Sequence, residues 1–105
     1  MPTYRAPVDD FRFILTELYD ASRLTGYKEY ADFAPDLMMS IVEEAGKFCE
    51  EVLSPLNASG DAEGCTWNDG VVTAPKGFKE AFKAYAEGGW IGLAADPEHG
   101  GQGLP

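Results

Sequence analysis

The sequence predicts an all-α domain with three main helices, at about residues 8–19, 35–55 and 75–88. In each of these stretches, apolar residues recur at the spacing that places them on one face of a helix. Only one short stretch, near residues 66–72, has the character of a β-hairpin. The composition, with 45% hydrophobic and 25% charged residues, is that of an ordinary folded protein rather than a disordered one. At 105 residues, the chain has the size of one domain.

The first helix is predicted from five apolar residues: Val8, Phe11, Leu15, Leu18 and Tyr19. Two aspartates, at positions 9 and 10, lie where carboxylates stabilise the positive end of a helix dipole. Residues 1–7 are expected to be extended, and residues 20–34 irregular, with one short turn in "YKEYADF".

The second helix has the strongest apolar pattern. Pro35 suits a first helical turn, whereas Ala34 offers no side-chain acceptor at the N-cap. The main apolar stripe consists of Leu37, Ile41, Ala45, Phe48, Val52 and Leu56. The stripe is broadened by Met38, Val42, Cys49 and Leu53. The whole apolar arc is wider than one helix–helix contact needs, which indicates more than one neighbour. Pro55 removes a backbone donor, so we expect the helix to kink or end there.

A loop is expected after Pro55, interrupted by a hairpin that turns at Asp69-Gly70, a pair that favours two-residue turns. Pro75 is expected to open the third helix, and Gly88-Gly89 to close it.

The charge of the chain excludes two classes of partner. Asp and Glu outnumber Lys and Arg by 18 to 8, which gives a net charge of −10. Such a field repels phosphate backbones and anionic lipids, so we expect no nucleic-acid or membrane-surface binding. No apolar run reaches the roughly 18 residues of a membrane span, and no secretory signal opens the chain. We therefore expect a cytoplasmic protein with Cys49 and Cys65 as free thiols.

Three groups of residues have the residue types that catalytic or ligand-binding sites use. Asp96, Glu98 and His99 are metal-ligand types, but near-consecutive loop residues point in different directions, so no metal site is expected. The "GGQG" of residues 100–103 lacks the strand and helix of a phosphate-binding loop, which predicts a structural turn. The carboxylate pairs Glu43-Glu44 and Glu50-Glu51 face different ways on a helix and are expected to be solvated.

Four stretches carry a family resemblance. "GGWIGLAADPEHGGQGLP", together with "FCEEVLSPLNASGDAEGC" and "APKGFKEAFKAYAEGGW", resembles the N-terminal helical domain of acyl-CoA dehydrogenases. The opening "YRAPVDDFRFILTEL" is similar to the extra N-terminal segment of a bacterial subgroup. That subgroup includes broad-specificity and 3-methylmercaptopropionyl-CoA dehydrogenases. The resemblance implies an N-terminal extension over residues 1–34 and an incomplete helical domain over residues 35–105, with a β-domain and a C-terminal helical domain absent.

The resemblance also implies a function. The full-length protein is expected to be a flavoprotein that forms a homodimer or a higher homo-oligomer. It is expected to desaturate an acyl-CoA thioester, with FAD as oxidant and an electron-transfer acceptor as partner. The catalytic glutamate and the flavin ligands are expected downstream of Pro105, so the segment alone is expected to be inactive. The residues expected nearest the acyl-CoA cleft are Pro97, Glu98, Gly100, Gly101 and Gly103. An alternative is a stand-alone acidic helical module that recruits a basic partner, which the coding frame beyond Pro105 would distinguish.

Overall fold

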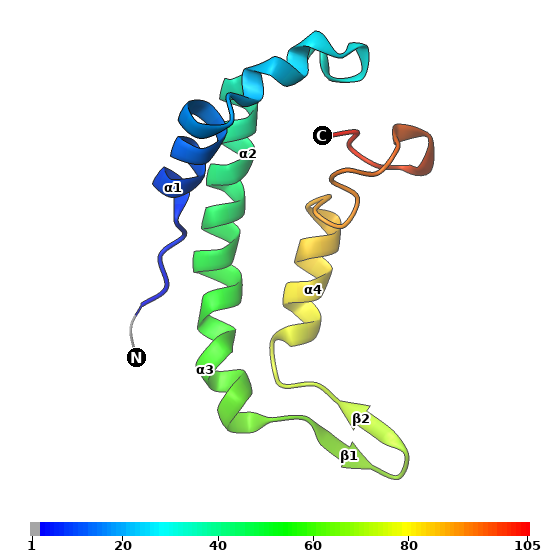
Figure 1. The fold of residues 1–105 in the computed structure, drawn as a ribbon. Helices are drawn as coiled ribbons and strands as arrows, with labels where there is room; N and C mark the ends of the chain where they lie inside the picture. The colour runs from blue at the N-terminus through cyan, green and yellow to red at the C-terminus, as the bar shows by residue number, and fades with distance from the viewer. Residues whose placement is uncertain (1–2) are drawn as a thin grey trace.

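The computed structural model describes residues 3–105, and its secondary structure is dominated by helices, which confirms the all-α class (Figure 1). The helices are α1 (Val8–Phe13), α2 (Pro35–Phe48), α3 (Ser54–Glu63) and α4 (Phe78–Glu87). Two π-helical turns follow α1 and α2, at Ile14–Leu18 and Cys49–Leu53. Short 3₁₀ turns occupy Ala21–Gly26, Lys28–Tyr30 and Pro97–His99. The two strands are β1 (Thr66–Asn68) and β2 (Val71–Thr73).

The central element is a single helical rod formed by α2, the π-helical turn and α3 (Figure 1). The expected end at Pro55 is therefore wrong, because the helix continues to Glu63. A proline inside an α-helix clashes with the carbonyl of the residue four positions earlier. Here the backbone N–H of Ser54 donates to the carbonyl of Cys49, five positions earlier, which widens the turn just before Pro55. A widened turn of this kind lets a helix pass a proline.

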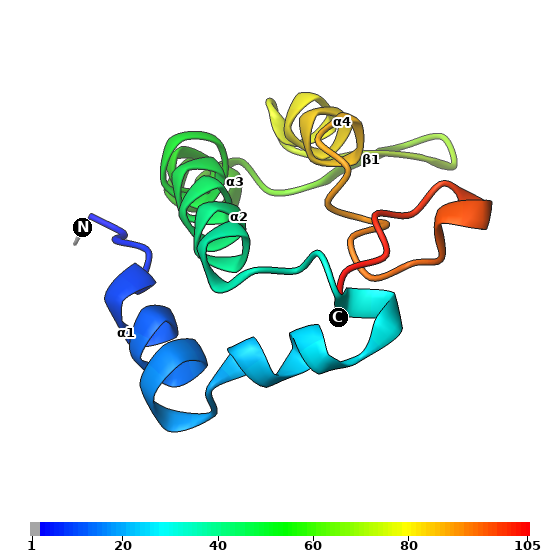
Figure 2. The same cartoon turned by 90° about the horizontal axis from the view of Figure 1, so that it is seen from above.

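The first helix lies along one side of this rod (Figure 2). It begins at Val8 as expected, and its last turn is π-helical and ends at Leu18. Arg12 pairs with Glu43 of α2 at 3.2 Å. The expected weak N-cap of α2 is confirmed, because Ala34 makes no side-chain hydrogen bond there. Near this end of α2, the buried side chains are those of Phe33, Met38 and Met39.

The last helix lies on the other side of the rod, where the rings of Phe48 and Tyr85 meet (Figure 2). It begins at Phe78, so the expected start at Pro75 is wrong. The reason is Gly77, whose φ of 91° lies in the left-handed region and breaks the helical backbone. The helix ends at Glu87, and Gly88 forms its C-cap.

The hairpin is confirmed. Strands β1 and β2 pair antiparallel, with Trp67 opposite Val72. Asp69 and Gly70 both have positive φ, at 49° and 81°, as a tight two-residue hairpin turn requires. All six strand residues are exposed, and the hairpin projects from one end of the molecule (Figure 1).

The described residues form a thin, open layer of 55 × 37 × 16 Å. The radius of gyration is 17.5 Å, against about 13 Å for a compact domain of this length. Among residues 3–105, no large side chain is fully buried. The most exposed large apolar side chains are those of Tyr19, Trp67, Val72 and Phe82. Within this part of the chain, no helix is long and apolar enough to cross a membrane.

Candidate functional site: the exit loop and its apolar groove

The segment after α4, residues 90–105, forms a loop that folds back on itself; we call it the exit loop. Several backbone hydrogen bonds join its two halves. Gln102 N–H donates to Gly92 at 2.9 Å, Gly103 N–H to Ala95 at 3.0 Å, and Leu104 N–H to Leu93 at 3.1 Å. The third bond places Leu93 beside Leu104, although they are far apart along the loop. The exit loop is therefore held together by backbone hydrogen bonds and is not an unstructured tail.

Gly101 allows the two halves to approach. A Cβ at this position would collide with the backbone carbonyl group of Ala95. The backbone N–H groups of Gly100, Gly101, Gln102 and Gly103 all donate within the loop. They are therefore not directed at a ligand, as they would be in a phosphate cradle. The structural-turn interpretation of "GGQG" agrees with this hydrogen bonding.

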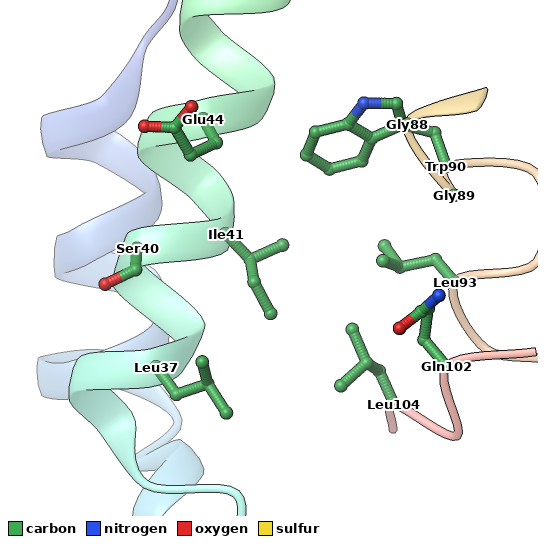
Figure 3. Close-up of a pocket in the computed structure, with 10 residues that line it drawn as sticks. All are labelled: Leu37, Ser40, Ile41, Glu44, Gly88, Gly89, Trp90, Leu93, Gln102 and Leu104. Atoms are coloured by element: carbon green, nitrogen blue, oxygen red, sulfur yellow. The ribbon is translucent and has the colours of Figure 1, made fainter. Parts of the chain in front are cut away.

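An apolar groove of about 380 Å³ lies between α2 and the exit loop (Figure 3). On one side, Leu37 and Ile41 of α2 point across the groove, while Ser40 points away from it. On the other side, Leu93 and Leu104 face them. The remaining lining residues are Glu44, Gly88, Gly89, Trp90 and Gln102. Such a surface suits an apolar group and offers few polar contacts to orient one.

Two further apolar hollows lie nearby. One, of about 230 Å³, shares Ile41, Leu93 and Leu104 with the first groove and is closed by residues of the N-terminal region and the start of the rod. Its other lining residues are Leu15, Ala21, Leu24, Phe33, Met38, Val42 and Pro105. The second, of about 460 Å³, lies between the rod and α4; we call it the α3–α4 groove. It is lined by Leu53, Leu56, Phe78, Ala81, Phe82 and Tyr85.

The five residues predicted to lie nearest a substrate cleft are placed on the exit loop, away from this lining. Of these, Pro97, Glu98 and Gly100 are exposed, while Gly101 and Gly103 are half-buried. The loop residues that do line the groove, Leu93 and Leu104, were not singled out from sequence. Only the backbone pairing between the halves of the loop brings them together, and neither lies in a motif. That the five predicted residues, Pro97, Glu98, Gly100, Gly101 and Gly103, lie near a substrate stays a prediction.

The residues considered for metal binding do not form a ligand set. The Asp96 carboxylate accepts a hydrogen bond from the backbone N–H of Glu98 at 2.8 Å, which caps the 3₁₀ turn. Across residues 3–105, no group of three or more His, Cys, Asp or Glu side chains is placed to hold a metal ion. Cys49 and Cys65 are both free.

The four helical glutamates are not equivalent. Glu44 binds Lys47 at 2.6 Å, and both side chains are well exposed. Glu50 is different, because its carboxylate is half-buried and accepts a hydrogen bond from the backbone N–H of Ala6 at 2.8 Å. The prediction that Glu50 is solvated is therefore wrong. The partner lies 44 residues away in sequence, which no local pattern shows.

One titratable group of the rod has a clear pKa shift. The hydrogen bond from Lys47 to Glu44 raises the pKa of the lysine above its ordinary value of 10.5, and the charges of Glu44, Glu43 and Glu51 add to this effect. The ammonium is fully exposed, so solvent screens the interaction. The lining of the groove between α2 and the exit loop is mainly apolar, and it contains no pair of titratable side chains suited to acid–base catalysis.

No protein-family model matches the chain. Two characterised proteins do. The chain is 37% identical over 103 residues to the 3-methylmercaptopropionyl-CoA dehydrogenase of Ruegeria pomeroyi, which covers 98% of the chain and 18% of that protein. It is 26% identical over 107 residues to the broad-specificity linear acyl-CoA dehydrogenase FadE5 of Mycobacterium tuberculosis, covering all of the chain and 18% of that protein. The chain is therefore similar to acyl-CoA dehydrogenases along nearly its whole length and spans about a fifth of the length of these relatives.

Proposed function

We propose that the protein containing this segment is an FAD-dependent acyl-CoA dehydrogenase, which introduces a double bond between the α and β carbons of an acyl-CoA thioester. The observation that carries the proposal is the 37% identity, over 98% of the chain, to a protein named 3-methylmercaptopropionyl-CoA dehydrogenase. The match to a linear acyl-CoA dehydrogenase over the whole chain supports the same reaction class. These two names point to substrates that share the CoA thioester and differ in the acyl group.

The segment contributes shape rather than reactive groups. The groove between α2 and the exit loop has a mainly apolar lining, as one wall of an acyl cleft requires. In this proposal Pro97, Glu98, Gly100, Gly101 and Gly103 lie on the side of the segment nearest the cleft. A wall of this kind discriminates between acyl chains by roughly 1–3 kcal/mol per misfit methylene.

The exit loop does not fit a flavin dinucleotide. A dinucleotide needs backbone N–H groups or cationic side chains directed at its phosphates. The backbone N–H groups of the glycine-rich loop donate to carbonyl groups of the exit loop itself. The only basic-type side chain in the exit loop is that of His99. We therefore assign the catalytic base and the FAD site to parts of the full-length protein outside residues 1–105.

Three finer features of the proposal rest on the family resemblance. The full-length protein is a homodimer or a higher homo-oligomer, works in the cytoplasm and passes its electrons to a separate acceptor. Within it, residues 1–34 are an extension and residues 35–105 a part of the N-terminal helical domain.

The test compares the full-length protein with residues 1–105. The purified full-length protein is expected to be yellow, with a flavin absorbance that bleaches when acyl-CoA is added and no acceptor is present. The segment is expected to be colourless and inactive. A panel of linear acyl-CoAs and one methylthio-acyl thioester then identifies the preferred acyl group. A full-length protein that binds no flavin would overturn the assignment.

A further inference from the structure

The apolar hollow of about 230 Å³ lies where three parts of the chain meet, and we call it the corner hollow. Leu24 lines it from the N-terminal extension, Ile41 from the rod, and Leu104 from the exit loop. Among the described residues, every one that lines the corner hollow is apolar. It therefore offers no polar group that could orient a ligand.

The size of the corner hollow suits side chains better than a ligand. Ligand pockets in proteins usually measure about 300–1,000 Å³, and this hollow is smaller. An apolar space left empty forfeits van der Waals contacts, and protein interiors contain few such voids. We therefore expect apolar side chains to fill the corner hollow in the full-length protein.

The 3₁₀ turn Ala21–Gly26 forms one wall of the corner hollow, and its hydrogen bonds are local. The backbone N–H of Arg23 donates to Asp20 at 3.1 Å, and that of Tyr27 donates to Leu24 at 3.0 Å. The side chain of Leu24 is half-buried and lines the hollow. Because local hydrogen bonds do not fix the turn against the rod, apolar contacts in the hollow decide how firmly it is held.

The exit loop ends at the corner hollow. The hydrogen bond from the backbone N–H of Leu104 to Leu93 fixes the last part of the loop, and Pro105 itself lines the hollow. Figure 2 shows the C-terminal end beside the turns of residues 21–30. The matched region is 18% of each relative, so the proposed full-length protein continues well beyond Pro105.

The residues directly after Pro105 are the nearest part of the remaining chain to the corner hollow. Consecutive Cα atoms lie about 3.8 Å apart, so these residues begin next to the hollow. The entropy cost of bringing two parts of a chain together rises with the length of the loop between them. A segment that follows Pro105 at once therefore fills the hollow at a lower entropy cost than a distant one.

We propose that the corner hollow is the docking site for the segment that directly follows Pro105, which places apolar side chains against Leu24 and Ile41. The N-terminal extension, the rod and the downstream chain thereby share one apolar core at this corner. The proposal rests on the proposed function only in that the full-length protein continues beyond Pro105.

The first experiment is photo-crosslinking in the full-length protein. The photoreactive amino acid p-benzoylphenylalanine replaces Leu24, and fragmentation mass spectrometry identifies the residue to which it links. The same replacement of Tyr19 is the matched control, because Tyr19 is in the same extension, is 70% exposed and does not line the hollow. A mixture of unlabelled and ¹⁵N-labelled protein distinguishes links within one chain from links between two copies.

Position 24 is expected to link to residues directly after Pro105 of the same chain, and position 19 is not. Links from position 24 to a distant segment, to a second copy or to added acyl-CoA would overturn the proposal. Links to Leu93, Leu104 and Pro105 alone would overturn it as well, because the following segment would then leave the hollow.

A second variant covers the case in which the bulky photoreactive residue prevents folding. Leu24→Lys introduces a charge into the apolar hollow and is expected to raise hydrogen–deuterium exchange of the residues directly after Pro105 by on the order of tenfold. Leu18→Lys is the control, because Leu18 is 58% exposed. Equal exchange of these residues in the two variants would contradict the docking.

Flavin absorbance, recorded on the same samples, separates this proposal from the proposed function. A protein that gives the expected crosslink but binds no flavin supports the docking and overturns the enzymatic assignment. A yellow protein without the crosslink does the reverse.

Discussion

The rings of Phe48 and Tyr85 meet between the helical rod and α4, with centroids 6.1 Å apart and planes inclined by 44°. This tilted arrangement is one that aromatic pairs favour. Tyr85 also lines the α3–α4 groove. The pair therefore helps to set the separation of the rod and α4, which form the walls of that groove.

The first prediction concerns the energy of this contact. Replacing Phe48 and Tyr85 by leucine, singly and together, is expected to show a coupling of about 0.5–1.5 kcal/mol in the free energy of unfolding of the full-length protein. The control cycle pairs Phe48→Leu with Tyr27→Leu, since Tyr27 is exposed and lies in another element. The control effects should add. Additive effects of Phe48 and Tyr85 would mean that the rings do not hold α4 in place.

The second prediction concerns Gly101. Gly101→Ala is expected to separate the halves of the exit loop, because the added methyl group would collide with the Ala95 backbone. The cost should be about 1–3 kcal/mol, the usual range for forced overpacking. Hydrogen–deuterium exchange of residues 92–104 in the full-length protein measures the opening. Gly26→Ala is the control, since a Cβ there meets nothing within 4 Å. Equal exchange in the two variants would show that the loop tolerates the methyl group.

The third prediction follows from the raised pKa of Lys47. A lysine pKa that is higher in the folded state contributes stability that is fully present below the unfolded pKa and is lost as the pH rises through the folded pKa. Glu44→Gln should therefore lower the pKa of Lys47, measured by NMR of its side chain. Any difference in stability caused by losing this pair should disappear at pH values above the folded pKa. Glu51→Gln should have a smaller effect on the same pKa, because Glu51 contributes least among the three carboxylates.

The helices and the hairpin were predictable because their signals are local. Spacing of apolar residues identified α1, α2 and α4, and Asp69-Gly70 identified the hairpin turn. The ends of the helices were harder to predict from the sequence. Pro55 is normally a helix breaker, and the π-helical turn that accommodates it follows from hydrogen bonding rather than from any residue preference. Pro75 is a plausible first helical residue by its type. The helix begins only at Phe78, because Gly77 has a left-handed backbone conformation.

The candidate site depends on contacts between distant residues. The sequence indicated the exit loop through its glycines, but not that Leu93 and Leu104 are paired and face Leu37 across a groove. Glu50 belonged to an apparently uniform acidic face, and only its hydrogen bond from the backbone N–H of Ala6 distinguishes it from Glu51. Neither relationship has a spacing that a single sequence can reveal.

The central claim is that the full-length protein oxidises an acyl-CoA thioester, and the most direct test is the mass of the product. The full-length protein is incubated with a saturated acyl-CoA and an artificial electron acceptor, and the thioester is then analysed by mass spectrometry. We expect an acyl-CoA that has lost two hydrogens, with the new double bond between the α and β carbons. A thioester recovered unchanged across linear and methylthio-acyl substrates, from a protein that retains its flavin, would contradict it.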